Sequence, residues 1–241
     1  MSGYCSRSAL LTIVFTIYCS TICGQTVLHK ASSNARLSAA PVDLSGVWLF
    51  QKQQDTFSPT EPPMQPWAYA KYNSAKPGYG PHANADSQDP IQSCLPPGMP
   101  RILLTPFPVQ IVQTRDEVIM LFEYDHLVRH IDLNRPVYPK NLAPTWMGDS
   151  IGKWKGNTLE VETTSLIESS WLDQVGHPHS DALHIIERIR RPDRDTLVDD
   201  ITIDDPKAYT KPWSGQQVFK LRPGWHIMEY VCQDLMEGQD K

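Results

Sequence analysis

Short runs in which apolar and polar residues alternate constrain the fold of this chain most. Successive side chains of a β-strand point to opposite faces, so alternation is typical of a strand with one buried face. In one run, Leu159 and Val161 alternate with Glu160 and Glu162. The sequence predicts about ten such strands, at residues 43–51, 110–113, 117–124, 127–133, 151–155, 158–164, 183–190, 197–203, 216–221 and 226–232.

The segments between these runs favour a sheet closed on itself. Gly156 and Asn157 separate two runs and predict a two-residue hairpin turn. Only 66–71 and 167–172 show a brief helical pattern, and no repeat has the period of a solenoid or propeller. Many short strands must protect their sheet edges, and closure into a barrel protects all of them. The sequence therefore predicts an all-β protein with a single antiparallel β-barrel.

The barrel domain is expected at 42–235, and the remaining segments predict what surrounds it. Residues 55–100 contain ten prolines, which exclude long regular elements. This proline-rich segment also carries aromatic residues that need apolar surface to cover, so we expect it to lie across an opening of the barrel: Trp67, Tyr69, Tyr72 and Tyr79. Residues 25–41 are small and polar, which predicts a flexible lead-in, and 236–241 form a short tail.

Residues 1–24 predict a signal peptide for export. Arg7 is the only charged residue before the apolar run 10–23, which has the length of a signal core and is short for a membrane span. Cleavage is expected near Gly24, with an uncleaved signal anchor as the alternative. The mature protein is therefore expected to be secreted or extracytoplasmic, without membrane attachment.

Cysteine usage agrees with export. Three of the five cysteines lie in the predicted signal, which leaves Cys94 and Cys232. Two cysteines in an oxidising compartment are expected to pair, and two separately buried thiols are the alternative. A bridge that closes so long a loop would stabilise the fold by roughly 4 kcal/mol in the chain-entropy model.

Charge and motifs exclude several classes of function. The formal net charge is −5, which argues against nucleic acid and anionic membranes as partners. The sequence has no glycine-rich phosphate loop, dinucleotide fingerprint or Cys-x-x-Cys pair, so no cofactor is expected. It also lacks the Gly-x-Ser-x-Gly elbow, which disfavours a serine hydrolase. The oligomeric state stays undetermined at this level.

The segment 176–191 concentrates titratable side chains. His177 and His179 are two residues apart, so in an extended chain both imidazoles face the same side. A His-x-His pair followed by further ligands resembles the pattern of the cupins, which are metal-dependent β-barrel enzymes. The pattern is only half met, because His184 stands near the position of the required glutamate and His226 follows with a different spacing. A metal site of these four histidines is one alternative, and a polar loop without catalytic function is another.

Glu187 is the second chemical feature of this segment. Its run places it on an otherwise apolar face with Leu183, Ile185 and Ile189, so we expect it inside the barrel. A carboxylate there needs a partner or a raised pKa. Arg129 and His126 are the candidate partners, and a purely structural Glu–Arg pair is the alternative. His184 lies on the opposite face and is expected to point outward.

Two resemblances bear on the fold. Gly46-Val47-Trp48 resembles the Gly-x-Trp motif of lipocalin-like (calycin-type) barrels, which implies that Trp48 closes one end of the barrel. Three blocks, TWMGDSIGKW, GHPHSDALH and IDDPKAYTKPW, resemble a family of exported, mostly uncharacterised bacterial proteins over residues 94–232. This second resemblance implies one shared fold and an export signal, and it carries no established reaction.

These patterns predict a barrel cavity for one small, largely apolar organic molecule. They favour a cofactor-independent acid/base step such as isomerisation, dehydration or cyclisation. His179 is expected to be the general acid or base, with Glu187 as its partner and Arg129 stabilising negative charge. His177 and His126 are further candidate catalytic residues. A non-catalytic lipocalin-like binding protein is the first alternative, and a metal-dependent cupin-like enzyme is the second.

Overall fold

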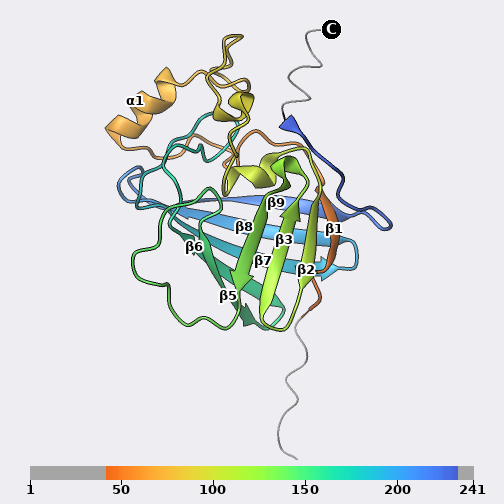
Figure 1. Ribbon diagram of the computed structural model, residues 1–241. Coiled ribbons are helices and arrows are strands. Elements are labelled where there is room, and N and C mark those ends of the chain that lie inside the picture. Colours follow the sequence, from red (N-terminus) through yellow and green to blue (C-terminus); the bar gives the residue numbers. More distant parts are fainter. Residues whose placement is uncertain (1–41, 233–241) are drawn as a thin grey trace, which may run out of the picture. The chain divides into compact units, whose positions relative to one another are not determined.

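The computed structural model describes residues 42–232, so the predicted signal, lead-in and tail lie outside the described residues. Nine strands form a closed barrel in which each strand pairs with its neighbours in chain order (Figure 1). The strands are β1 (Gly46–Phe50), β2 (Val109–Gln113), β3 (Glu117–Phe122), β4 (Val128–Asp132), β5 (Asp149–Lys155), β6 (Thr158–Thr164), β7 (His184–Asp193), β8 (Thr196–Asp204) and β9 (Trp213–Leu221). The all-β prediction is confirmed.

Nine of the ten predicted runs are strands, and the tenth, 226–232, is not. β1 pairs with both β2 and β9, so the described barrel leaves no open edge for another strand. The segment 222–232 instead runs outside the barrel, where the backbone N–H of Met228 donates to Glu123 Oε2 at 2.9 Å. The predicted hairpin is confirmed, since β5 and β6 pair from Lys155 and Thr158 onward around Gly156.

The barrel is not wholly antiparallel as predicted. β4 and β5 are parallel, with Ile131 opposite Ser150 and Asp132 opposite Ile151. Parallel neighbours need a crossover connection instead of a hairpin. Residues 133–148 form that crossover, so β5 starts beside the end of β4 and the two strands run in the same direction.

Trp48 is buried in the barrel as the Gly-x-Trp pattern predicts. Its side chain is 0 % exposed. The indole N–H donates to the carbonyl of Leu44 at 2.9 Å, and the guanidinium of Arg191 lies 5.0 Å from the ring centroid. The ring therefore has packing, a hydrogen bond and a cation–π contact.

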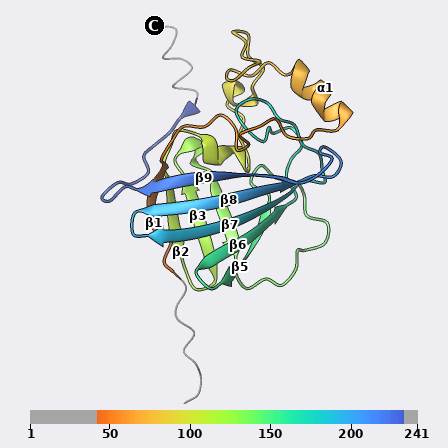
Figure 2. The same cartoon turned by 180° about the vertical axis from the view of Figure 1, so that it is seen from behind.

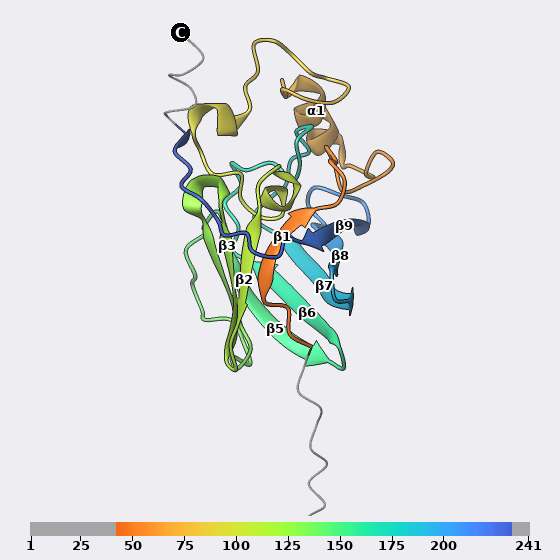
Figure 3. The ribbon, with the colours of Figure 1, turned by 90° about the vertical axis from the view of Figure 1, so that its right-hand side faces the viewer.

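The proline-rich segment covers one end of the barrel (Figure 3). Its elements are short, as the prolines require: helix α1 (Pro66–Ser74), the 3₁₀ helix η1 (Pro90–Ser93) and, just after it, the 3₁₀ helix η2 (Arg101–Leu104). The view from behind shows α1 beside the ends of β8 and β9 (Figure 2). The second predicted helical stretch, 167–172, is a turn, because the N–H of Leu172 bonds to the carbonyl of His177 instead of to the preceding turn.

Two links hold this cover in place, a buried ion pair and a disulfide. Arg101 is 1 % exposed and makes a bidentate ion pair with Asp89, in which Nη1 lies 2.7 Å from Oδ1. The predicted disulfide between Cys94 and Cys232 is present and joins the cover to the end of the described chain. Such a bond is compatible with an oxidising compartment, and export itself remains a prediction. Within residues 42–232 the structure has no helix that could span a membrane.

Candidate functional site

The densest group of buried polar side chains lies in residues 170–182, which we call the histidine loop. The loop joins β6 to β7 at the covered end of the barrel (Figure 3). A buried polar group lowers the stability of the fold unless it has a hydrogen-bond partner. The hydrogen bonds of this loop therefore show which side chains are saturated and which have a free donor or acceptor. The side chains concerned are at most 8 % exposed: Ser170, Asp173, Gln174, His177, His179 and Ser180.

Asp173 and His177 form a buried pair around the tight turn at Gly176, whose φ is +93°. Asp173 Oδ1 accepts the backbone N–H groups of Val175 and His177, both at 3.2 Å, which explains the turn. Asp173 Oδ2 lies 2.5 Å from Nδ1 of His177. The carboxylate therefore holds the hydrogen on Nδ1 and orients the ring.

The other ring nitrogen of His177, Nε2, is not occupied by a hydrogen bond within residues 42–232. Nε2 is buried and has no hydrogen-bond partner among the described residues, and the same holds for Nε1 of Trp213. The imidazole stacks on Tyr72 of α1 with ring centroids 4.4 Å apart and planes at 6°, and the Trp213 centroid lies at 6.3 Å. An imidazole with one nitrogen fixed by a carboxylate and the other free is the arrangement of a general base.

His179 lies beside this pair but has no free nitrogen. Nε2 lies 2.8 Å from the hydroxyl of Ser170, and Nδ1 lies 3.0 Å from the carbonyl of Ser180. Asp205 accepts both the N–H and the hydroxyl of Ser180 at 2.7 Å, which holds this part of the loop. Burial lowers the pKa of His179, so the ring is kept neutral and serves as a hydrogen-bonding element of the loop.

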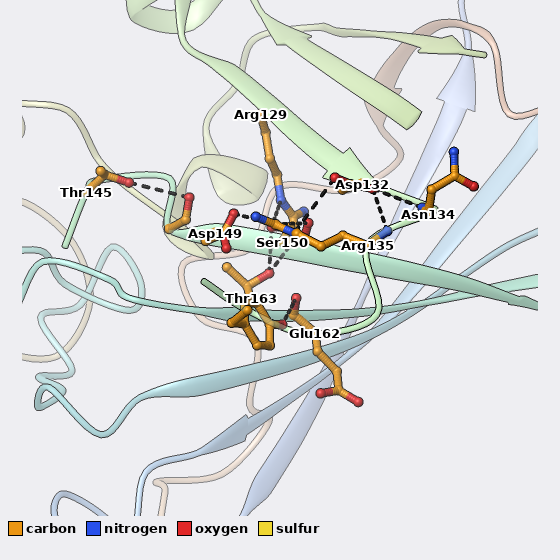
Figure 4. A network of polar contacts seen from close by, with 11 residues as sticks. Arg129, Asp132, Asn134, Arg135, Thr145, Asp149, Ser150, Glu162 and Thr163 are labelled. Carbon is orange, nitrogen blue, oxygen red and sulfur yellow. Dashed lines mark hydrogen bonds and ion pairs between the residues drawn. The ribbon is translucent and has the colours of Figure 1, made fainter. Parts of the chain in front are cut away.

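Arg129, one of the two candidate partners, meets Glu187 inside the barrel, and its guanidinium also lies beside Ser150 and Thr163 (Figure 4). Arg129 Nη1 donates to Glu187 Oε1 at 2.9 Å, and Nη2 binds Oε2. The guanidinium also donates to Ser150 at 3.1 Å and Thr163 at 2.8 Å. The side chains of the two ions are 1 % and 0 % exposed. The structure therefore pairs Glu187 with Arg129 and not with an imidazole.

Asp199 on β8 is a third ionisable group inside the barrel. It is 2 % exposed, and its Oδ1 has no hydrogen-bond partner among the described residues. Burial raises the pKa of Asp199 well above its ordinary value, and the negative charge of Glu187 raises it further. Burial and the neighbouring carboxylate of Glu187 therefore both favour the protonated form of Asp199.

This proton predicts a pH-dependent stability. Asp199 holds its proton more strongly in the folded protein than in the unfolded chain. The stabilisation that this proton gives is therefore complete below about pH 3.9, and it is lost as the pH rises through the pKa of Asp199 in the folded protein. We expect the stability of the wild type relative to Asp199→Asn to fall over that range by at most about 1.4 kcal/mol per pH unit. Urea unfolding of both proteins between pH 4 and 8 measures this difference, and a constant difference would contradict the buried proton.

The other predicted histidines lie apart from this loop pair. His126 is exposed in the 3₁₀ helix η3 (Tyr124–His126), where its Nε2 accepts the backbone N–H of Tyr230 at 3.1 Å. The alternative in which His126 pairs with Glu187 is therefore wrong. His184 faces the outside, as predicted, 3.4 Å from Glu162. His226 is exposed near Glu123. The described residues contain no group of three or more ligands placed for a metal ion.

A pocket of about 150 Å³ lies between the proline-rich segment and the loops that follow β1, η2 and β3. We call it the aromatic pocket. Its lining residues are Gln53, Asp55, Tyr79, Ile91, Thr105, Pro106, Phe107, Tyr124 and Gln174. Gln174 belongs to the histidine loop, so the loop contributes both to this pocket and to the Asp173–His177 pair.

Sequence reasoning missed Asp173 and Asp199, although local signals for both exist. Asp173 precedes a glycine and a histidine at the spacing of a side-chain-capped turn. Asp199 is two residues from both Leu197 and Ile201, so it shares their inward face of β8 and lies inside the barrel. Tyr72 and Trp213 had no local signal, because they approach His177 only through the tertiary fold.

No family model matches the chain, and the comparison with curated proteins found no significantly similar sequence. The resemblance of the three sequence blocks and the lipocalin-like assignment therefore stay predictions.

Proposed function

We propose that the protein is an exported small-molecule enzyme in which His177 moves a proton in a cofactor-independent acid/base reaction. The main support is the buried Asp173–His177 pair. Its Nδ1 lies 2.5 Å from the carboxylate, and its Nε2 has no hydrogen-bond partner among the described residues. Asp173 orients the ring and stabilises the imidazolium that forms when Nε2 takes up a proton. Isomerisation, dehydration and cyclisation all use such a step.

His177 takes the role that the sequence alone assigned to His179. A general base needs a free lone pair, and both nitrogens of His179 are already hydrogen-bonded. Glu187 and Arg129 bind each other inside the barrel, so they support the fold and take no part in the proposed step. His126 is likewise outside the proposed site.

Access to His177 is controlled by α1. Tyr72 is 4 % exposed and lies flat on the imidazole. The helix is attached by the indole N–H of Trp67, which donates to the carbonyl of Lys207 at 2.7 Å, and by the N–H of Gln65, which donates to Ala208 at 2.8 Å. A substrate reaches Nε2 when this short helix moves aside, which is the behaviour of a lid that excludes water during proton transfer.

Deuterium exchange tests the proposal without a known product. The protein is incubated in D₂O with a panel of small cyclic and branched ketones, unsaturated aldehydes and β-hydroxy ketones, and deuterium uptake at carbon is followed by NMR. We expect wild-type protein to accelerate uptake for at least one compound. His177→Gln is expected to lower that rate by roughly 10²–10⁴, because the proton acceptor is lost.

The matched control is His184→Gln, which removes an imidazole from the outer face and should leave the rate unchanged. Asp173→Asn should lower the rate while the protein stays folded by circular dichroism, because the ring loses its orienting charge. Equal rates for wild type and His177→Gln with every compound would overturn the proposal.

A non-catalytic binding protein is the second candidate, and the aromatic pocket favours it. The pocket has about the volume of a single-ring molecule, and His177 is not among its lining residues. This candidate predicts ligand binding without deuterium uptake, and an affinity that is indifferent to His177→Gln.

A further inference from the structure

The aromatic pocket combines three aromatic side chains with one carboxylate. Tyr79 comes from the proline-rich segment, Phe107 from the turn after η2, and Tyr124 from η3. Phe107 and Tyr124 are held against each other and against Tyr230, with ring centroids 5.2, 5.0 and 4.7 Å apart. This cluster makes one wall of the pocket rigid before any ligand binds, which reduces the cost of ordering on binding.

Asp55 is the only charged residue among the described residues that line the pocket. Its side chain makes no ion pair or hydrogen bond with the described residues, while its backbone carbonyl accepts the N–H of Gln174 at 2.9 Å. A ligand that fills the pocket displaces water from this carboxylate. A neutral ligand leaves the charge without a counter-charge, whereas a cation compensates it.

Arg101, a buried cation next to the pocket, does not cancel the preference of the Asp55 carboxylate for a cationic ligand. Arg101 binds Gln174 Oε1 through Nη2 at 2.7 Å, so it lies behind one wall of the pocket. Its charge is already matched by the bidentate pair with Asp89. The lining thus offers one carboxylate, the amides of Gln53 and Gln174, and aromatic rings, which attract cations through their negative faces.

We propose that the aromatic pocket binds a small organic ammonium ion. The volume of about 150 Å³ limits the ligand to about the size of a single ring or of a quaternary ammonium group with a short chain. The aromatic wall favours a methylated ammonium over a primary one, because methyl groups spread the charge and replace water at apolar surface. This inference is independent of the proton-transfer function proposed for His177.

Calorimetric titration with choline and with 3,3-dimethylbutan-1-ol tests the proposal, because the two compounds share a shape and differ in charge. We expect choline to bind at least about tenfold more tightly than the neutral compound. Asp55→Asn should remove this difference by weakening choline alone. Phe107→Leu should weaken choline severalfold while thermal unfolding confirms an intact fold.

The matched control is Asp86→Asn, which removes the same charge from an exposed position of the proline-rich segment and should leave choline affinity unchanged. Equal affinities of the two compounds for the wild type, no heat with choline up to 20 mM, or choline binding that survives Asp55→Asn would each overturn the inference. None of these outcomes depends on turnover, so they leave the deuterium-exchange result for His177 unaffected.

Discussion

Replacement of Glu187 by alanine is expected to lower the free energy of unfolding by about 3–5 kcal/mol, because it leaves Arg129 charged and buried without its carboxylate. Arg129 is 1 % exposed, so water cannot replace the lost partner without opening the barrel. Ser150 and Thr163 still accept hydrogen bonds from the guanidinium but bring no negative charge, and Asp199, the other carboxyl near Arg129, makes no hydrogen bond with it. Urea unfolding at pH 7, followed by tryptophan fluorescence, measures the loss.

The matched control is the double variant Arg129→Met/Glu187→Leu, which removes both charges and keeps the volume close to the original. We expect it to recover most of the stability, because the cost in Glu187→Ala comes from the unpaired ion and not from the loss of the attraction. In Glu187→Ala the pKa of Asp199 should also fall, since the charge of Glu187 is one cause of its elevation. Equal losses in the single and double variants would contradict the buried-pair interpretation.

Trp48→Ala is expected to cost about 3–5 kcal/mol of stability. The change empties the volume of the largest fully buried side chain and removes the indole hydrogen bond to the carbonyl of Leu44. It also leaves the guanidinium of Arg191 without the ring on which it lies. Thermal and urea unfolding measure the effect, and far-UV circular dichroism checks that the strands persist in the variant.

Trp225→Ala serves as the matched control, because the side chain of Trp225 is 53 % exposed. The same substitution there should change the free energy of unfolding by no more than about 0.5 kcal/mol. A similarly small effect at Trp48 would refute the role of that ring as a core residue of the barrel.

Alternation along single strands determined which residues enter the barrel. Side-chain direction in a strand repeats every two residues and depends on the backbone alone. The sequence therefore predicted that Glu187 points inward and His184 outward, and both predictions are confirmed. The pairing of two cysteines was also predictable, because few partners were available.

The tertiary structure decided which side chains and which strands pair wherever the sequence allowed several partners. Arg129 and His126 were equal candidates for Glu187, and the break at η3 separates them: Asp125 and His126 adopt φ of +58° and +48°, which interrupts the strand face that His126 needed to share. The order of strands around the barrel, including the parallel pairing of β4 with β5, likewise depends on where the 133–148 crossover packs.

The site shows the same division. The sequence by itself determined that titratable groups gather in 176–191 and that a proline-rich segment needs a surface to cover. Only the folded chain decided that Tyr72 covers His177, that Ser170 occupies Nε2 of His179, and that Nε2 of His177 has no hydrogen-bond partner among the described residues. The physical reason is the separation along the sequence of the residues that interact. Strand periodicity and turns depend on neighbours along the chain. Hydrogen-bond saturation and burial depend on residues that are distant in sequence and meet only when the barrel closes.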